Sequence, residues 1–272
     1  MNNQSLLKTA IEAALEAGKV ISEIYHDPTS DFEVEKKADN SPLTIADRKS
    51  NEVIISYLKQ TPYPIISEEC KNMDYTIRKE WKTEWVVDPL DGTKEFIKRN
   101  GEFTVNIALV CDGCPTLGVI YIPEKRVLYY GSLQEGAYRV DDIDAKNGAD
   151  FAVVENRSIK LPLERKDGKY IVVASKSHMS AETESYINSL KEQHSEVSLT
   201  SIGSSIKICL VAEGTADIYP RFAPTMEWDT AAGHAIVRAA GKEVYRIDET
   251  TPLRYNKEDL LNPWFIVRTK RD

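Results

Sequence analysis

The sequence has no run of 18 apolar residues, the length that a helix needs to cross a lipid bilayer. Residues 1–25 also lack the basic start and the small-residue cleavage site of a secretion signal. Their apolar positions, among them Leu7, Ile11 and Leu15, keep a mostly helical spacing. We therefore expect no transmembrane segment, and an amphipathic helix of the folded protein over residues 5–25.

Cysteine is scarce, with four residues in 272, and this is typical of a protein from a reducing compartment. Cys111 and Cys114 form a C-x-x-C pair that could bind zinc or carry out redox chemistry. The intervening Asp-Gly lies between two strand-like runs, which favours a plain hairpin turn. A zinc site would need four ligands, and Cys70 and Cys209 have no paired spacing.

Positive charge is in deficit, since 35 Lys and Arg stand against 43 Asp and Glu, a net charge of -8. Such a surface disfavours DNA, RNA and anionic membranes as main partners. A small anionic ligand remains compatible with it, because bound metal ions or a local group of cations can override the overall sign. We therefore expect a small-molecule partner and no nucleic acid.

The chain shows no internal repeat and no low-complexity tract. Helical patterns cover residues 5–25 and 45–60, and short turns join the strand-like runs between residues 63 and 140, which favours an antiparallel sheet. From residue 170 onward strands alternate with helices, which is typical of a layered α/β fold. The sequence predicts one compact unit of two subdomains, residues 1–150 and 151–272, with the site between them.

The stretch "WVVDPLDGT" places two carboxylates close together. Asp88 ends an apolar strand, Pro89 prevents that strand from continuing, and Asp91 follows. Gly92 and Thr93 then begin a new segment, whose free amides and absent side chain would suit a phosphate group. The alternative is an ordinary turn in which Asp91 caps a helix.

Further acids follow other apolar elements. Glu68 and Glu69 end the run "PIISEE", and Asp229 stands at the start of a small-residue helix. Each is explained by itself as a solvated strand end or a helix cap. Gathered in one cleft, however, these carboxylates would repel one another unless cations neutralised them. Oxygen ligands without His or Cys favour Mg²⁺, and a magnesium cluster is suited to phosphate-ester chemistry.

Thr44 and Asp47 fit a T-x-x-D capping pattern before the second helix. Capping alone would explain Asp47. The catalytic alternative is that Asp47 orients the hydroxyl of Thr93, which then aligns an attacking water.

Together, "DPLDGTKEF", "WDTAAGHA" and "ISEE" resemble the signature motifs of the inositol monophosphatase superfamily of Mg²⁺-dependent, lithium-sensitive phosphatases. The Lys94-Glu95-Phe96 continuation is similar to its bisphosphate nucleotidase branch. The resemblance implies an α-β-α-β-α sandwich with an antiparallel N-terminal sheet and a mixed C-terminal sheet. It implies hydrolysis of the 3'-phosphate of adenosine 3',5'-bisphosphate with two or three Mg²⁺ ions, in support of sulfur assimilation and nucleotide recycling. It also implies a cytoplasmic monomer or homodimer, in solution or at the inner face of the cell membrane.

The resemblance further implies roles for individual residues. The carboxylates of Glu68, Asp88, Asp91 and Asp229 and the carbonyl of Leu90 would bind metal. Glu68, Asp47 and Thr93 would be catalytic, with Glu69 in support. Lys36 and Lys37 would lie on a flap near the metals. Substrate contacts would come from Gly92, Thr93, Ser175, His178, Ser204, Lys207, Arg221 and Asp229. For His178 and Lys207 the alternative is a purely structural place at a helix.

Three rival functions are open to these residues. A haloacid-dehalogenase-like phosphatase also has Asp, Gly and Thr after a strand, but its two acids are two positions apart, whereas Asp88 and Asp91 are three apart. A sugar phosphatase acting on inositol phosphates or fructose bisphosphate is a rival within the family. A catalytically silent metal-binding regulator would be favoured by the loss of a metal carboxylate, and none is lost.

Overall fold

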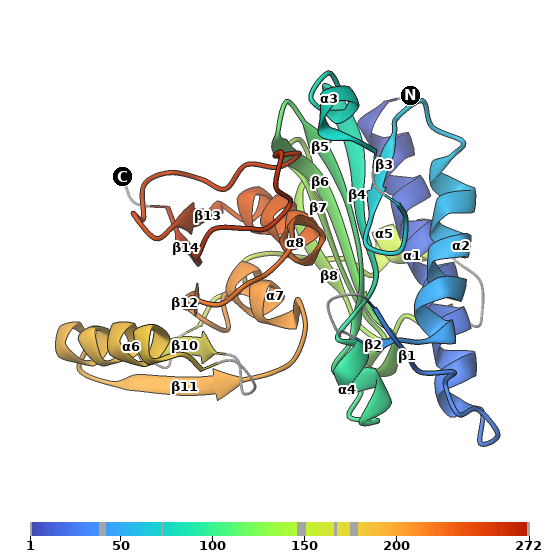
Figure 1. The fold of residues 1–272 in the computed structure, drawn as a ribbon. Coiled ribbons are helices and arrows are strands. Elements are labelled where there is room, and N and C mark those ends of the chain that lie inside the picture. The colour runs from blue at the N-terminus through green and yellow to red at the C-terminus, as the bar shows by residue number, and fades with distance from the viewer. Residues whose placement is uncertain are drawn as a thin grey trace.

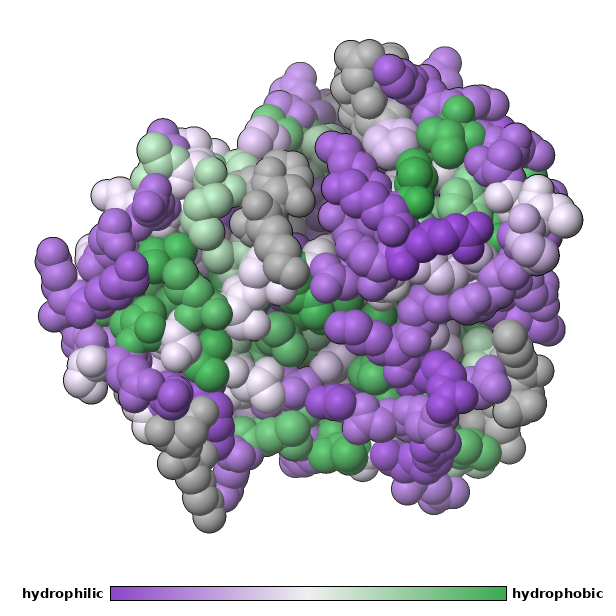
Figure 2. Space-filling view, turned by 90° about the horizontal axis from the view of Figure 1, so that it is seen from below, coloured by the Kyte–Doolittle hydropathy of each residue, from purple (hydrophilic) through white to green (hydrophobic). Residues whose placement is uncertain are grey.

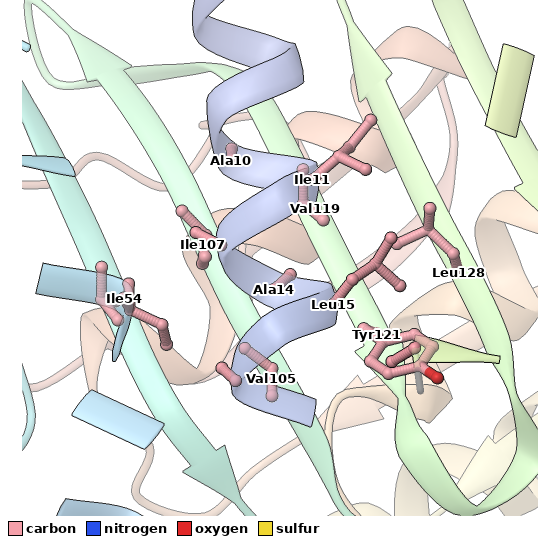
Figure 3. Close-up of a cluster of buried hydrophobic side chains, with 14 of the residues drawn as sticks. Ala10, Ile11, Ala14, Leu15, Ile54, Val105, Ile107, Val119, Tyr121 and Leu128 are labelled. Atoms are coloured by element: carbon pink, nitrogen blue, oxygen red, sulfur yellow. The ribbon is translucent and has the colours of Figure 1, made fainter. Parts of the chain in front are cut away.

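Two long helices form the first layer of the molecule. They are α1 (Asn3–His26) and α2 (Ile45–Leu58), as the sequence predicts, and the side chains of Asn2 and Thr44 cap their first turns. The apolar stripe of α1 faces a large sheet, and Figure 3 shows Ala10, Ile11, Ala14 and Leu15 beside the sheet residues Val105, Ile107 and Val119.

The computed structural model describes residues 2–37, 42–71, 73–145, 151–165, 168–174 and 179–270.

The second layer is a seven-stranded sheet in the order β3-β4-β5-β6-β7-β8-β9. The strands from β4 onward pair antiparallel, which confirms the prediction for this half. The exception is β3, which runs parallel to β4 because the connection through α3 (Tyr75–Arg78) returns the chain to the same end of the sheet. The strands are β3 (Ile65–Ser67), β4 (Thr83–Asp91), β5 (Thr104–Cys111), β6 (Cys114–Ile122), β7 (Val127–Ser132), β8 (Gly136–Val140) and β9 (Ile159–Lys160).

The third layer consists of α7 (Ile206–Glu213) and α8 (Glu227–Ala239), whose apolar side chains fill a second core against the other face of the large sheet. The backbone of α8 comes very close to β6 at Gly118, where an added Cβ would lie 2.2 Å from the Ala232 carbonyl oxygen. A glycine is therefore required at this position.

A smaller mixed sheet and α6 (Ala181–Gln193) complete the molecule. Figure 1 shows α1 and α2 on the right, the large sheet beside them and the smaller sheet on the left. This arrangement confirms the predicted α-β-α-β-α sandwich, with a mixed second sheet. The sheet order is β11 (Val197–Ser201), β10 (Tyr170–Ala174), β12 (Ile218–Arg221), β14 (Phe265–Thr269) and β13 (Lys242–Arg246).

Short elements connect the layers. The segment predicted as a flap contains a two-stranded hairpin, and its residues 38–41 lie outside the described residues. The remaining elements are β1 (Glu35–Lys36), β2 (Pro42–Leu43), α4 (Thr93–Ile97), η1 (Pro123–Lys125) and α5 (Phe151–Asn156).

The edge strand β11 carries an exposed apolar residue, Leu199. Seen from below, apolar surface gathers on the side of the molecule that holds β10, β11 and α6, while the opposite side is mostly hydrophilic (Figure 2). Within the described ranges, none of the helices is both long and apolar enough to span a bilayer.

Candidate active site

An irregularity in β4 positions its two carboxylates. Asp88 pairs with Asn106 and Asp91 pairs with Thr104, so three steps along β4 match only two along β5. Such a bulge bends a strand and re-aims its side chains. The hydroxyl of Ser50 in α2 donates a hydrogen bond of 2.6 Å to the Pro89 carbonyl oxygen, which anchors the bulge to the first helix layer.

The parallel pairing of β3 with β4 brings a third acid to the same place. Ser67 lies opposite Val87, and the amide of Glu68 donates to the Val87 carbonyl oxygen over 3.2 Å. Because β3 and β4 run parallel, Glu68, which follows the last residue of β3, lies level with Asp88 of β4.

The fourth acid, Asp229, lies in the first turn of α8. Asp229 accepts a hydrogen bond of 2.8 Å from the Met226 amide, which caps the helix. Ser205 joins it to β4, because its amide donates to the Asp91 carboxylate over 2.5 Å and its hydroxyl donates to the Asp229 carbonyl oxygen over 2.8 Å. Sequence reasoning missed Ser205 and named its neighbour Ser204, since nothing in "GSSIK" shows which serine faces the acids.

These four carboxyls lie near enough to one another for their charges to interact. Burial, and then the charges of Glu68, Asp91 and Asp229, raise the pKa of Asp88 well above its usual range. Burial and the neighbouring Asp91 do the same to the pKa of Asp229. Asp88 is only 1% exposed, so water does little to stabilise its charge. A cation placed among these groups would remove the repulsion.

Lys37 places one positive charge beside two of the acids at this site. Its ammonium lies 2.6 Å from a carboxylate oxygen of Glu68 and 2.5 Å from one of Glu69. Burial alone would lower the pKa of Lys37, but the two carboxylates outweigh burial and raise it. The predicted proximity of this lysine to the acids is therefore present in the structure.

The donor set fits Mg²⁺ in its chemistry, since all the gathered groups are hard oxygens whose charges repel one another. In the parts of the chain that the structure describes, no three His, Cys, Asp or Glu side chains surround one point closely enough to hold an ion as they stand. Contacts to Lys37 and Ser205 occupy oxygens of Glu68 and Asp91. Ion binding would therefore exchange these contacts for metal bonds.

Asp47 makes contacts consistent with both of its predicted roles. One carboxylate oxygen accepts from the amide and the hydroxyl of Thr44, which confirms the capping box. The other oxygen accepts a hydrogen bond of 3.0 Å from the hydroxyl of Thr93. Burial raises the pKa of Asp47, although the hydrogen bonds from Thr44 act against it. The threonine hydroxyl is thus oriented, and it lies 3.4 Å from the Leu90 carbonyl oxygen.

Gly92 precedes α4 with a φ of 98°, a conformation that residues with a side chain rarely adopt. An added Cβ would also lie 3.0 Å from the Glu102 carbonyl oxygen. Both facts explain why glycine stands beside the acids.

A cavity of about 360 Å³ opens next to the acids, and its lining includes Asp91, Gly92, Ser204, Lys207, Arg221 and Asp229. The ammonium of Lys207 donates to the carbonyl oxygens of Ser204 and Ile202 over 2.6 and 3.2 Å. Burial lowers the pKa of Lys207 to about 8, although the nearby Asp91 carboxylate raises it. The guanidinium of Arg221 donates to the Pro224 carbonyl oxygen over 3.2 Å.

The remaining predicted substrate contacts differ in their placement. The hydroxyl of Ser204 is buried and has no hydrogen-bond partner within the described segments. Ser175 and His178 lie outside the described residues. The cavity therefore brings Ser204, Lys207 and Arg221 together with the acids of β4 and α8.

Comparison with known proteins gives matches over nearly the whole chain. A model of the inositol monophosphatase family matches residues 2–270. The 3'(2'),5'-bisphosphate nucleotidase CysQ of Escherichia coli strain K12 is 45% identical over 265 residues, which cover 96% of this chain and 99% of that protein. A CysQ protein of Haemophilus influenzae is 30% identical and covers 97% and 93% of the two chains.

Solved structures agree with these matches. The crystal structure of CysQ from Bacteroides thetaiotaomicron, titled a bacterial member of the inositol monophosphatase family, is 59% identical, has a TM-score of 0.92 and covers 99% of both chains. The protein suhB from Bartonella henselae is 24% identical with a TM-score of 0.75 over 98% of this chain and 94% of that one, a likeness of fold alone. The resemblance inferred from the motifs is confirmed.

Proposed function

Because this chain belongs to the inositol monophosphatase family and is a phosphatase, we propose that it removes the 3'-phosphate of adenosine 3',5'-bisphosphate, giving AMP and phosphate. The observation that carries this proposal is the similarity, over nearly the full length of both chains, to proteins named 3'(2'),5'-bisphosphate nucleotidase. The substrate would be a small nucleotide that carries two anionic groups. We place this activity in the cytoplasm.

Five groups would hold two or three Mg²⁺ ions. They are the carboxylates of Glu68, Asp88, Asp91 and Asp229 and the carbonyl oxygen of Leu90. The support for this assignment is that the charges of Glu68, Asp91 and Asp229 act together on the buried carboxyl of Asp88 and raise its pKa. When bound, magnesium supplies Lewis acidity toward a phosphate ester.

The protein's own residues would orient the attacking water. The Thr93 hydroxyl donates a hydrogen bond to the Asp47 carboxylate, so the lone pairs of the Thr93 oxygen are left to accept a hydrogen bond from water. This contact would hold the water in line with the phosphorus. Glu68 would support the water from the end of the neighbouring strand β3, and Glu69 would support Glu68 through their shared contact with Lys37.

The cavity would receive the rest of the substrate. Lys207 and Arg221 place two cations along its lining beside the acids, which suits a ligand with a second anionic group. Gly92 lets a phosphate approach the backbone closely, and the hydroxyl of Ser204, which has no partner in the described part of the chain, is available to hydrogen-bond with it. Ser175 and His178 stay proposed contacts from the family motifs.

A substrate panel tests this proposal. Phosphate release would be measured with Mg²⁺ from adenosine 3',5'-bisphosphate, its sulfated analogue, inositol 1-phosphate and fructose 1,6-bisphosphate. We expect the highest kcat/KM for the adenosine compounds. A higher value for inositol 1-phosphate or fructose 1,6-bisphosphate would contradict the nucleotidase assignment in favour of a sugar phosphatase.

The variant Asp88→Asn tests the metal centre. We expect a loss of turnover of at least about a hundredfold, because one buried metal ligand would lose its charge. Asp31→Asn is the matched control, since Asp31 is exposed. Near-normal activity of Asp88→Asn would refute the assigned role of Asp88.

A further inference from the structure

The β5–β6 hairpin places the two cysteines of the C-x-x-C pair directly opposite each other. Cys111 and Cys114 are register partners, and a two-residue turn joins their strands. The turn residues Asp112 and Gly113 have φ values of 48° and 70°, the positive values that a type I′ hairpin requires. The structure thus confirms the predicted turn. Residues opposite each other on antiparallel strands share one face of the sheet, with Cβ atoms about 4.5–5.5 Å apart.

The other two cysteines are not arranged in this way. Cys209 is buried in α7, and Cys70 lies beside Asn51 after the end of β3. Cys111 and Cys114 are both partly exposed, so a small reagent can reach them. Zinc does not explain the pair, because no group of three His, Cys, Asp or Glu side chains able to hold a metal occurs among the described residues.

We propose that Cys111 and Cys114 are a reversible thiol-oxidation site, which closes as a disulfide across the hairpin when a small disulfide such as oxidised glutathione is present. Disulfide Cβ atoms are about 3.8 Å apart, so the strands must approach by about 1 Å beyond their ordinary spacing. That distortion makes the bond easy to reduce, as is usual for strained and accessible disulfides. The site would stay reduced in a reducing compartment and close under oxidising conditions.

The chemistry needs only the small disulfide as oxidant. One protein thiolate attacks a sulfur of the reagent, which forms a mixed disulfide and releases one small thiolate. The second protein thiolate then attacks the bound cysteine sulfur and releases the other small thiolate. The protein loses two thiol protons and two electrons, and one small disulfide is reduced to two thiols.

Tertiary contacts hold the hairpin tip in place. The guanidinium of Arg254 contacts the Cys114 sulfur and donates to the Asp112 carbonyl oxygen over 2.9 Å, and the Tyr255 amide donates to Gly113 over 3.1 Å. Figure 1 shows this segment before β14 reaching the turn at the top of the sheet. A disulfide would turn the Cys114 sulfur away from Arg254 and toward Cys111.

The site lies at the far end of β5 from the acids. Thr104, which pairs with Asp91, begins the strand that Cys111 ends, and eight residues of strand span roughly 25 Å. Phosphatase activity is therefore not the readout, and the test is independent of the proposed function.

The test uses the folded protein, oxidised with glutathione disulfide and then digested with trypsin after its free thiols are blocked. Residues 100–125 form one tryptic peptide, which contains both cysteines of the pair and neither Cys70 nor Cys209. We expect this peptide to lose two hydrogens, two of the four thiols to disappear, and dithiothreitol to reverse both changes. Cys70→Ser should behave like the unaltered protein, whereas Cys114→Ser should keep a stable glutathione adduct on Cys111.

Several results would overturn the proposal. All four thiols could remain reactive after oxidation. Glutathione adducts could persist together on Cys111 and Cys114, which would show that the second step does not occur. A disulfide between two chains would show that the hairpin does not close on itself.

Discussion

Glu84 lies on β4, four residues before Asp88, and it is fully buried. Neither of its carboxylate oxygens has a hydrogen-bond partner in the described part of the chain. Burial, and then the charge of Glu227, raise the pKa of Glu84 to about 8, with Asp112 adding to the shift and Arg78 opposing it. The carboxyl is therefore mostly protonated in the folded protein at neutral pH. We predict that Glu84→Gln changes how stability depends on pH.

The direction in which stability changes with pH follows from the pKa of Glu84 in the unfolded and in the folded state. In the unfolded chain the carboxyl titrates near about 4.3, below the folded value of about 8. The folded state thus binds the proton more tightly, so this contribution to stability is fully present below about pH 4.3 and is lost as the pH rises to about 8. Inside that window each pH unit costs about 1.4 kcal/mol, or about 2.7 kcal/mol between roughly pH 5.5 and 7.5.

The glutamine side chain does not titrate, so the Glu84→Gln variant does not lose this contribution to stability as the pH rises. We expect the unfolding free energy of Glu84→Gln, relative to the unaltered protein, to rise by about 2–3 kcal/mol from roughly pH 5.5 to 7.5. Urea denaturation would measure it, with fluorescence of the buried neighbour Trp85 as the signal. Glu80→Gln is the control, because Glu80 is exposed and should leave the curve unchanged. Parallel curves for Glu84→Gln and the unaltered protein would refute the reasoning.

Three further predictions concern the site and the core. Asp47→Ala should lower kcat, because the Thr93 hydroxyl would lose the carboxylate that orients it, and it should leave the Mg²⁺ affinity measured by calorimetry nearly unchanged. An unchanged kcat would show that Asp47 takes no part in the mechanism. In the unaltered protein the KM for adenosine 3',5'-bisphosphate should rise above about pH 8, because Lys207 loses its charge, and Lys207→Met should abolish this rise. The same dependence of KM on pH in both proteins would show that another group is responsible. Gly118→Ala should lower Tm and cost about 1–3 kcal/mol, since its Cβ would collide with α8, and an unchanged melting curve would contradict the close contact.

Much of the local structure follows from the sequence alone. The 3.6-residue spacing in α1, the apolar runs of β4 to β8 and the Asp-Gly turn of the cysteine hairpin each depend on residues close together in the chain. The Thr44–Asp47 capping box is local for the same reason. The motif residues Asp88, Asp91 and Asp229 each fit an ordinary strand end or helix cap, and they could be singled out only as a set that resembles the family motifs.

Other features depend on which elements become neighbours. The parallel entry of β3 places Glu68 beside Asp88, and Ser205 links Asp91 to α8, although no local pattern indicates either contact. The same holds for Glu84, which is buried in β4 and whose carboxylate has no hydrogen-bond partner among the residues that the structure describes. Periodicity reports only which face a residue takes within its own element. The contacts between elements, and with them the shifted pKa values of the site, are decided by how the layers pack.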